Sequence, residues 1–185
     1  MDADTVSAIF NAGLVAVDNY RECYGPDFRE DGVSERSLSA MMALQLHESG
    51  FNAPPEALYT QIVDHLHMPI DEAARTRIRQ LRADIALYKD GQPKAVIELK
   101  IISDGDRLAE FARDLFKGDP VFLSERLPVY AVALICETKN RTLDQQKAWV
   151  DVSVGQPLSY SRTMLTSTGE GWKWCFGCAR RGPSN

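Results

Sequence analysis

The chain has 185 residues, of which 44% are hydrophobic and 25% charged, and its formal net charge is −5. This size and composition predict a single globular domain over residues 1–185 and leave little room for a second one. The acidic balance excludes a generally cationic coat for nucleic acid, although a local group of arginines could still bind one. Apolar runs fall well short of the roughly 20 residues of a membrane span, and the N-terminus lacks the basic start of a signal peptide. We therefore expect a cytoplasmic protein with no membrane partner.

Two amphipathic helices are predicted at the start of the chain. Apolar residues recur at spacings of three and four over 5–20, and a loop with glycines and a proline follows at 25–32. The second helix runs from its N-cap, Ser34, to about residue 49, with Glu35 in its first turn.

A third helical pattern covers 55–67, where Pro55 suits a first turn. The segment 71–80 is either a helix or extended, and four arginines lie in it or just after it. They are Arg75, Arg77, Arg79 and Arg82. Charge runs of this kind usually form a solvated surface.

The remaining pattern alternates strands with helices. We predict a hairpin of strands 82–88 and 94–102, a helix over 105–117, a buried strand over 127–136, a helix over 142–149, and a β-rich C-terminal extension over 150–178. This order predicts an α/β fold in which a central mixed sheet is flanked by helices.

Charges interrupt the apolar hairpin at Asp84, Glu98 and Lys100. With Gly91 at the centre of the turn, residues whose numbers sum to 182 pair, so Asp84 faces Glu98 and Arg82 faces Lys100. Directly opposed side chains share one side of a sheet with Cβ atoms about 5 Å apart. The three charges should therefore meet on one face, with an apolar face behind them.

Two carboxylates this close repel each other unless a proton or a cation lies between them. Mg²⁺ suits such a place because it takes hard oxygen ligands and keeps several waters, and we expect Mn²⁺ to substitute. The carbonyl of Leu99 could complete the ligand set, and Lys100 could orient or deprotonate an attacking water. The patch predicts a phosphodiesterase centre. A second E-x-K triplet, Glu137 to Lys139, follows the buried strand, and we interpret it as a strand end entering a loop.

The segments "RADIAL" and "AVIELKI" resemble the PD-(D/E)xK, or restriction-endonuclease-like, nuclease superfamily over about residues 34–136. The signature proline is absent, since Ala83 precedes Asp84. The resemblance implies a restriction-endonuclease-like core, here over about 34–150 with an additional N-terminal helix. It also implies that Asp84 and Glu98 bind Mg²⁺ and that Lys100 serves the attacking water.

In this superfamily a glutamate on the preceding helix often joins the metal site, which makes Glu35 the candidate and Glu48 the reserve. The resemblance gives Arg82 a contact to the scissile phosphate or, equally, a role in balancing the acidic patch. We assign Arg77 and Arg79, from the same basic segment, to nucleic-acid binding.

The cysteines give weaker patterns. Cys175 and Cys178 form one C-x-x-C without a second ligand pair, so we do not expect structural zinc. Some RecB-type relatives hold an iron–sulfur cluster, but here Cys136 lies in the buried strand and the fourth ligand is missing, so a cluster is not expected either.

The leading hypothesis is a Mg²⁺-dependent endo- or exonuclease, most simply for DNA, of the kind found in restriction, repair or phage-defence systems. Cutting both strands would require a homodimer or two events, and specificity could come from the loops at 49–80 or an accessory subunit. The alternative is a catalytically inactive nuclease-like fold that binds nucleic acid or a protein.

Overall fold

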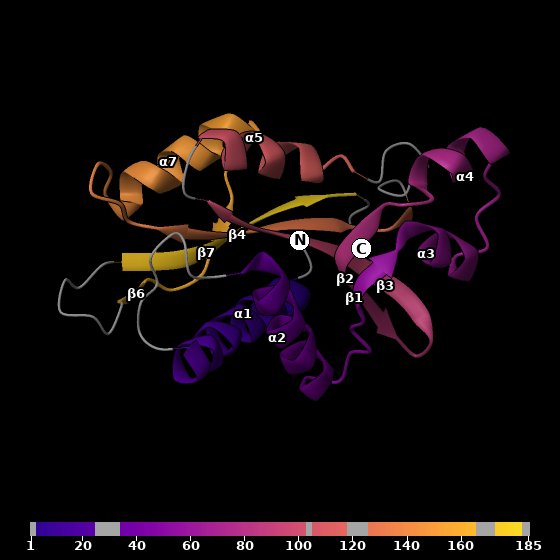
Figure 1. The fold of residues 1–185 in the computed structure, drawn as a ribbon, viewed down its shortest axis with the longest axis horizontal. Coiled ribbons are helices and arrows are strands. Elements are labelled where there is room, and N and C mark those ends of the chain that lie inside the picture. Colours follow the sequence, from indigo (N-terminus) through magenta and orange to yellow (C-terminus); the bar gives the residue numbers. More distant parts are fainter. Residues whose placement is uncertain (1–2, 25–33, 103–104, 118–125, 166–172, 183–185) are drawn as a thin grey trace.

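The computed structural model describes residues 3–24, 34–102, 105–117, 126–165 and 173–182, in which helices cover both faces of a mixed sheet (Figure 1). The seven strands are β1 (Pro55–Leu58), β2 (Arg82–Lys89), β3 (Gln92–Ile102), β4 (Val129–Cys136), β5 (Ser159–Tyr160), β6 (Met164–Leu165) and β7 (Lys173–Arg181). Their order is β1-β2-β3-β4-β7-β5, with β6 also pairing with β7. β3 and β4 are parallel and every other pair is antiparallel. The predicted α/β class with a mixed central sheet is confirmed.

Six helices lie in the described residues: α1 (Ala3–Tyr24), α2 (Glu35–Glu48), α3 (Tyr59–His65), α4 (Glu72–Ile78), α5 (Gly105–Asp114) and α7 (Leu143–Val154). The predicted N-cap of α2 is confirmed, because the Ser34 hydroxyl accepts a hydrogen bond from the Ser37 N–H. No helix of the described ranges is long and apolar enough to cross a membrane.

The helix predicted over 55–67 is partly wrong. Residues 55–58 form the edge strand β1, and only Tyr59–His65 are helical. Pro55 has no N–H to donate, which an edge strand tolerates as well as a helical first turn does. The basic segment that follows is helical, and Asp71 caps it by accepting from the Ala74 N–H.

The hairpin turn consists of Asp90 and Gly91, both with positive φ (53° and 74°), as a two-residue turn requires. This turn pairs Lys89 with Gln92, one residue out of the predicted register. A bulge beside Leu87 then restores the predicted register, so that Ile85 pairs with Ile97.

The C-terminal segment, predicted as an extension, belongs to the same sheet. β7 pairs antiparallel with the whole of β4, from Val129–Arg181 to Cys136–Trp174. α1 crosses this strand, and an added Cβ at Gly13 would lie 2.8 Å from the Phe176 ring. The loop predicted at 25–32 lies outside the described residues.

The core has one large cluster on one face of the sheet, under α1 and α2. Two smaller clusters lie on the opposite face: one under α3 and α4, the other under α5 and α7. The strand β3 crosses both smaller clusters, with Val96 in the first and Ile102 in the second. Between these two positions the same face of β3 carries Glu98 and Lys100.

Candidate active site

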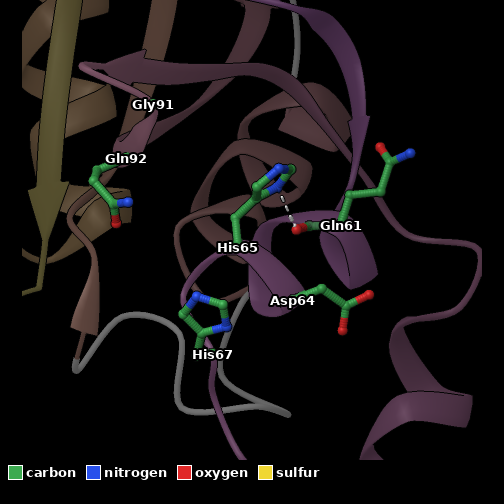
Figure 2. A pocket seen from close by; sticks show the side chains of 6 residues that line it. All are labelled: Gln61, Asp64, His65, His67, Gly91 and Gln92. Atoms are coloured by element: carbon green, nitrogen blue, oxygen red, sulfur yellow. Dashed lines mark hydrogen bonds between the residues drawn. The ribbon is translucent and has the colours of Figure 1, made fainter.

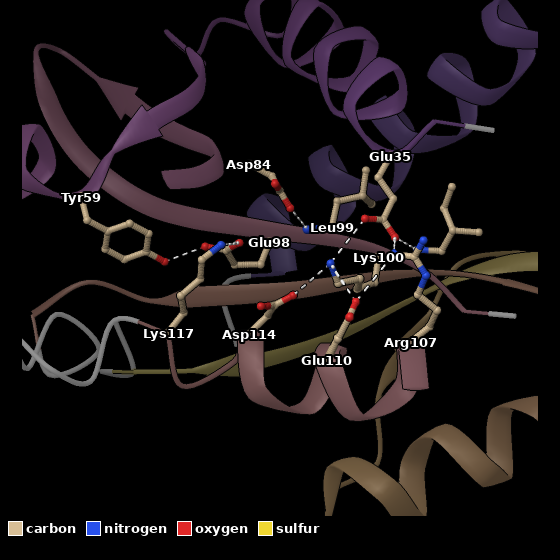
Figure 3. A network of polar contacts seen from close by, with 11 residues as sticks. Glu35, Tyr59, Asp84, Glu98, Leu99, Lys100, Arg107, Glu110, Asp114 and Lys117 are labelled. Carbon is tan, nitrogen blue, oxygen red and sulfur yellow. Dashed lines mark hydrogen bonds and ion pairs between the residues drawn. The ribbon is translucent and has the colours of Figure 1, made fainter. Parts of the chain in front are cut away.

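The candidate site occupies the gap between the two smaller clusters, on the α5 side of β3 (Figure 3). Successive side chains of a strand point to opposite faces, so Ile97 and Leu99 enter the large core while Glu98 and Lys100 point toward α5. The predicted apolar face and polar face of β3 are both present.

Strands β2 and β3 separate at this point. Their pairing runs only as far as Ile85 and Ile97, and Arg82 pairs with Leu58 of β1. The expected pairing of Arg82 with Lys100 is therefore wrong, and Asp84 lies just beyond the last ladder pair. The splayed strands leave backbone N–H groups of β3 without strand partners.

Two carboxylates accept hydrogen bonds from these backbone N–H groups. Asp84 Oδ2 accepts from the Leu99 N–H at 2.6 Å, and Glu35 Oε1 accepts from the Ile101 N–H at 3.2 Å. Because the N–H and C=O of one strand residue point to the same side, the Leu99 carbonyl also faces this opening. Glu35 thus reaches the site from the first turn of α2, whereas Glu48 lies exposed at the other end of that helix.

Glu98 is almost completely enclosed, with 1% of its surface exposed. Its Oε1 accepts a hydrogen bond from the Tyr59 hydroxyl at 2.6 Å, and its Oε2 contacts Lys117 Nζ at 2.7 Å. Burial raises the pKa of Glu98 to about 8, against the attraction of Lys117, and the neighbouring Asp84 carboxylate adds to the rise. Burial also raises the pKa of Tyr59 well above its usual value, so its hydroxyl remains a donor.

Lys100 lies among three carboxylates. Its Nζ is 3.3 Å from Glu35 Oε2, 3.6 Å from Glu110 and 3.6 Å from Asp114. Burial by itself would lower the pKa of Lys100, but these acidic neighbours outweigh it and the net shift is upward. Arg107 joins the group by contacting Glu35 Oε1 at 3.2 Å.

The cluster has more acidic than basic groups. Its five carboxyl groups are Glu35, Asp84, Glu98, Glu110 and Asp114, and its three cations are Lys100, Arg107 and Lys117. Burial raises the pKa of Asp84 despite its hydrogen bond from the Leu99 N–H, and burial likewise raises that of Asp114. Burial thus favours the protonated form of these carboxyl groups, and the cluster holds two more carboxyl groups than cations.

The ligand chemistry fits Mg²⁺. Asp84, Glu98 and the Leu99 carbonyl offer hard oxygens, and Mg²⁺ commonly takes only one or two carboxylates and completes its shell with water. Among the described residues, no group of three or more His, Cys, Asp or Glu side chains is arranged so that it could hold a metal ion, so this ligand set depends on two carboxylates and a backbone carbonyl. Lys117 also contacts the Glu98 oxygen, so a metal ion at that oxygen would have to displace the ammonium.

The structure adds residues that the sequence reasoning missed. Arg107, Glu110 and Asp114 recur at spacings of three and four on one face of α5, and this polar stripe was a usable signal. Tyr59 and Lys117 had no such signal, because they come from separate segments that only the folded chain brings to Glu98.

The predicted nucleic-acid contacts do not belong to this cluster. Arg77 and Arg79 are exposed on and just after α4. Arg82 is exposed at the start of β2, where its guanidinium donates to the Glu56 carbonyl.

The other candidate positions do not join this site. Cys175 and Cys178 are buried on opposite faces of β7, in different core clusters, so they do not converge on one ligand. Glu137 lies just after β4, as predicted, and accepts from the Lys173 N–H.

A separate open pocket of about 350 Å³ lies by the hairpin turn (Figure 2). Its lining residues are Gln61, Asp64, His65, His67, Gly91 and Gln92. At about 3.3 Å per residue along β3, the turn lies roughly 20 Å from Glu98. The pocket is therefore distinct from the acidic cluster.

No family model, curated protein or solved structure matches the chain.

Proposed function

We propose that this protein is a Mg²⁺-dependent nuclease that hydrolyses phosphodiester bonds, with DNA as the substrate. The observation that carries the proposal is the convergence of Asp84, Glu98, Lys100 and Glu35 at the stretch of β3 where β2 separates from it, from segments up to 65 residues apart. Enclosing Glu98 beside further carboxylates costs stability that an apolar side chain would avoid. Perturbed carboxyl groups gathered between two apolar clusters are typical of a functional site.

Each residue has a defined role in this proposal. Asp84, Glu98 and the Leu99 carbonyl hold the metal, which supplies charge neutralisation and a more acidic water. Glu35 holds Lys100 and supports the metal directly or through water. The Leu99 N–H fixes the Asp84 carboxylate, and the Tyr59 hydroxyl fixes that of Glu98.

Lys100 acts as a cation in this scheme. Its raised pKa keeps the ammonium protonated at neutral pH, so it is suited to orienting the attacking water and to stabilising negative charge on the phosphate. Removing a proton from that water is left to another base, which revises the role of deprotonation predicted from the sequence.

Exposed arginines supply the substrate contact. Arg77, Arg79 and Arg82 would bind the phosphate backbone, which positions a strand without reading its sequence. One such site cuts one strand, so a double-strand break would require a homodimer, an accessory subunit or two events.

The test is cleavage of labelled DNA and RNA, single- and double-stranded, with Mg²⁺ or Mn²⁺ and with chelator. We expect DNA cleavage that chelator abolishes and that Asp84→Asn lowers at least about 100-fold, since this variant removes a metal-binding charge but keeps the shape. Asp90→Asn, at the hairpin turn, is the matched control and should cleave like the parent. An Asp84→Asn protein with full activity would refute the assignment.

One observation favours a second candidate, an inactive nuclease-like module. Lys117 and Tyr59 already satisfy both oxygens of Glu98, so the site is partly neutralised from within. Calorimetric titration with Mn²⁺ separates the two functions: a site lost in Asp84→Asn supports the nuclease, and no metal binding supports the module.

A further inference from the structure

Lys117 is the cation in contact with the most enclosed carboxylate of the site. Its Nζ lies 2.7 Å from Glu98 Oε2, with 24% of the Lys117 side chain and 1% of the Glu98 side chain exposed. A buried carboxylate without a counter-charge is strongly destabilising. Lys117 therefore has a clear function in the metal-free protein, where it is the cation that balances Glu98 whenever this carboxyl group is ionised.

The same contact conflicts with metal binding. An ammonium has three donors and no lone pair, so it cannot serve as a ligand and it repels a cation bound to the same oxygen. The other oxygen, Oε1, is already bound by the Tyr59 hydroxyl at 2.6 Å. Oε2 is thus the oxygen that a divalent cation would take, and Lys117 holds it.

Lys100 does not conflict in this way. Its three ionic contacts are to Glu35, Glu110 and Asp114, at 3.3 to 3.6 Å, and none is to Asp84 or Glu98. The two lysines of the site therefore differ: Lys100 contacts Glu35, which supports the metal directly or through water, whereas Lys117 contacts an oxygen of Glu98, which holds the metal.

The position of Lys117 allows it to leave. It lies in the turn after α5, on a flexible four-carbon stem, and its side chain reaches solvent. Asp114, three residues earlier, is near enough to attract the ammonium and is among the groups that raise the pKa of Lys117. Withdrawal of the ammonium from Glu98 requires rotation of one side chain and no movement of the strands.

We propose that Lys117 is a tethered counter-ion that holds the place of a divalent cation at Glu98, and that Mg²⁺ or Mn²⁺ binds by exchanging with it. The inference rests on the proposed function, because it requires that Glu98 be a metal ligand. It predicts that Lys117 weakens metal binding, because its ammonium occupies the Glu98 oxygen that the metal would take.

The test is isothermal titration of the full chain with Mn²⁺, and with Mg²⁺, at one pH. The variants are Lys117→Met, which keeps the stem and removes the charge, and Lys117→Arg, which keeps a charge. Lys94→Met, exposed on β3, is the matched control. The rise in melting temperature on adding Mn²⁺ is the second readout, since a ligand stabilises the folded state in proportion to its affinity.

We expect Lys117→Met to bind Mn²⁺ at least about tenfold more tightly than the parent, because a competing unit charge within contact distance is removed. The metal-induced rise in melting temperature should increase with it, while Lys117→Arg and Lys94→Met stay near the parent. If Lys117→Met does not fold, Lys117→Gln takes its place. Mn²⁺ binding to the uncharged variant that is equal to or weaker than binding to the parent overturns the inference but leaves the nuclease proposal standing. If neither the parent nor any variant binds Mn²⁺ or Mg²⁺, both the inference and the nuclease proposal are overturned.

Discussion

Replacing Glu98 by glutamine should change the free energy of unfolding of the metal-free protein by an amount that depends on pH. Glu98 has a pKa of about 8 in the folded protein, against 4.5 for a free carboxyl, because it is buried. The folded state thus binds the Glu98 proton more tightly than the unfolded state does. Its contribution to stability is fully present below about pH 4.5 and is lost as the pH rises to about 8.

The magnitude follows from the shift. A rise from 4.5 to about 8 corresponds to roughly 5 kcal/mol of lost stability above pH 8. Lys117 loses its ionic partner in Glu98→Gln, which offsets part of the gain. We therefore expect the variant to be about 2–4 kcal/mol more stable than the parent at pH 8.5 and close to it at pH 5.

The measurement is urea unfolding of both proteins, with chelator, at pH 5 and pH 8.5. The difference in free energy of unfolding between variant and parent at each pH cancels the contributions of the other titrating groups, because the two proteins share them. A Glu98→Gln protein that is equally destabilised at both pH values would refute the argument from burial.

Three further changes test the surrounding structure. Tyr59→Phe should lower the free energy of unfolding by about 1–3 kcal/mol, because the buried Glu98 loses a donor, and an unchanged urea midpoint would contradict that contact. Gly13→Ala should destabilise by about 1–3 kcal/mol through its clash with Phe176, whereas a stabilised variant would mean that helix propensity outweighs the clash. Arg79→Ala should weaken binding to different DNA sequences alike and reduce the slope of log affinity against log salt by about 0.9, and an unchanged slope would remove Arg79 from the interface.

The strand pair was predictable because its side chains alternate so regularly. Burial of Ile85, Leu87, Ile97 and Leu99 on one face fixes which residues point to the other. The pairing at the turn was predicted one residue out of register. The bulge beside Leu87 restores the predicted pairing of Ile85 with Ile97, which keeps the apolar face of the hairpin in the core. The separation of β2 and β3 beyond Ile85 had no local signal.

A place for Glu35 in the site was predicted from the family resemblance alone, which did not predict its contact with Lys100. Its position in a helical first turn is local, but its distance from β3 depends on how α2 packs across the sheet. Tyr59 and Lys117 were missed for the same reason: their contacts with Glu98 are long-range, and the pattern over 55–67 had favoured a continuous helix instead of a strand followed by a helix.

The most direct test of the account is the single-turnover rate of Mg²⁺-dependent DNA cleavage by the parent, Lys100→Ala and Lys94→Ala. Both lysines lie on β3, but Lys94 is exposed and Lys100 lies within the acidic cluster. We predict cleavage by the parent and by Lys94→Ala, and a loss of at least about 100-fold in a folded Lys100→Ala protein. Cleavage by Lys100→Ala at the parent's rate, or none by the parent on any DNA or RNA substrate, would contradict the account.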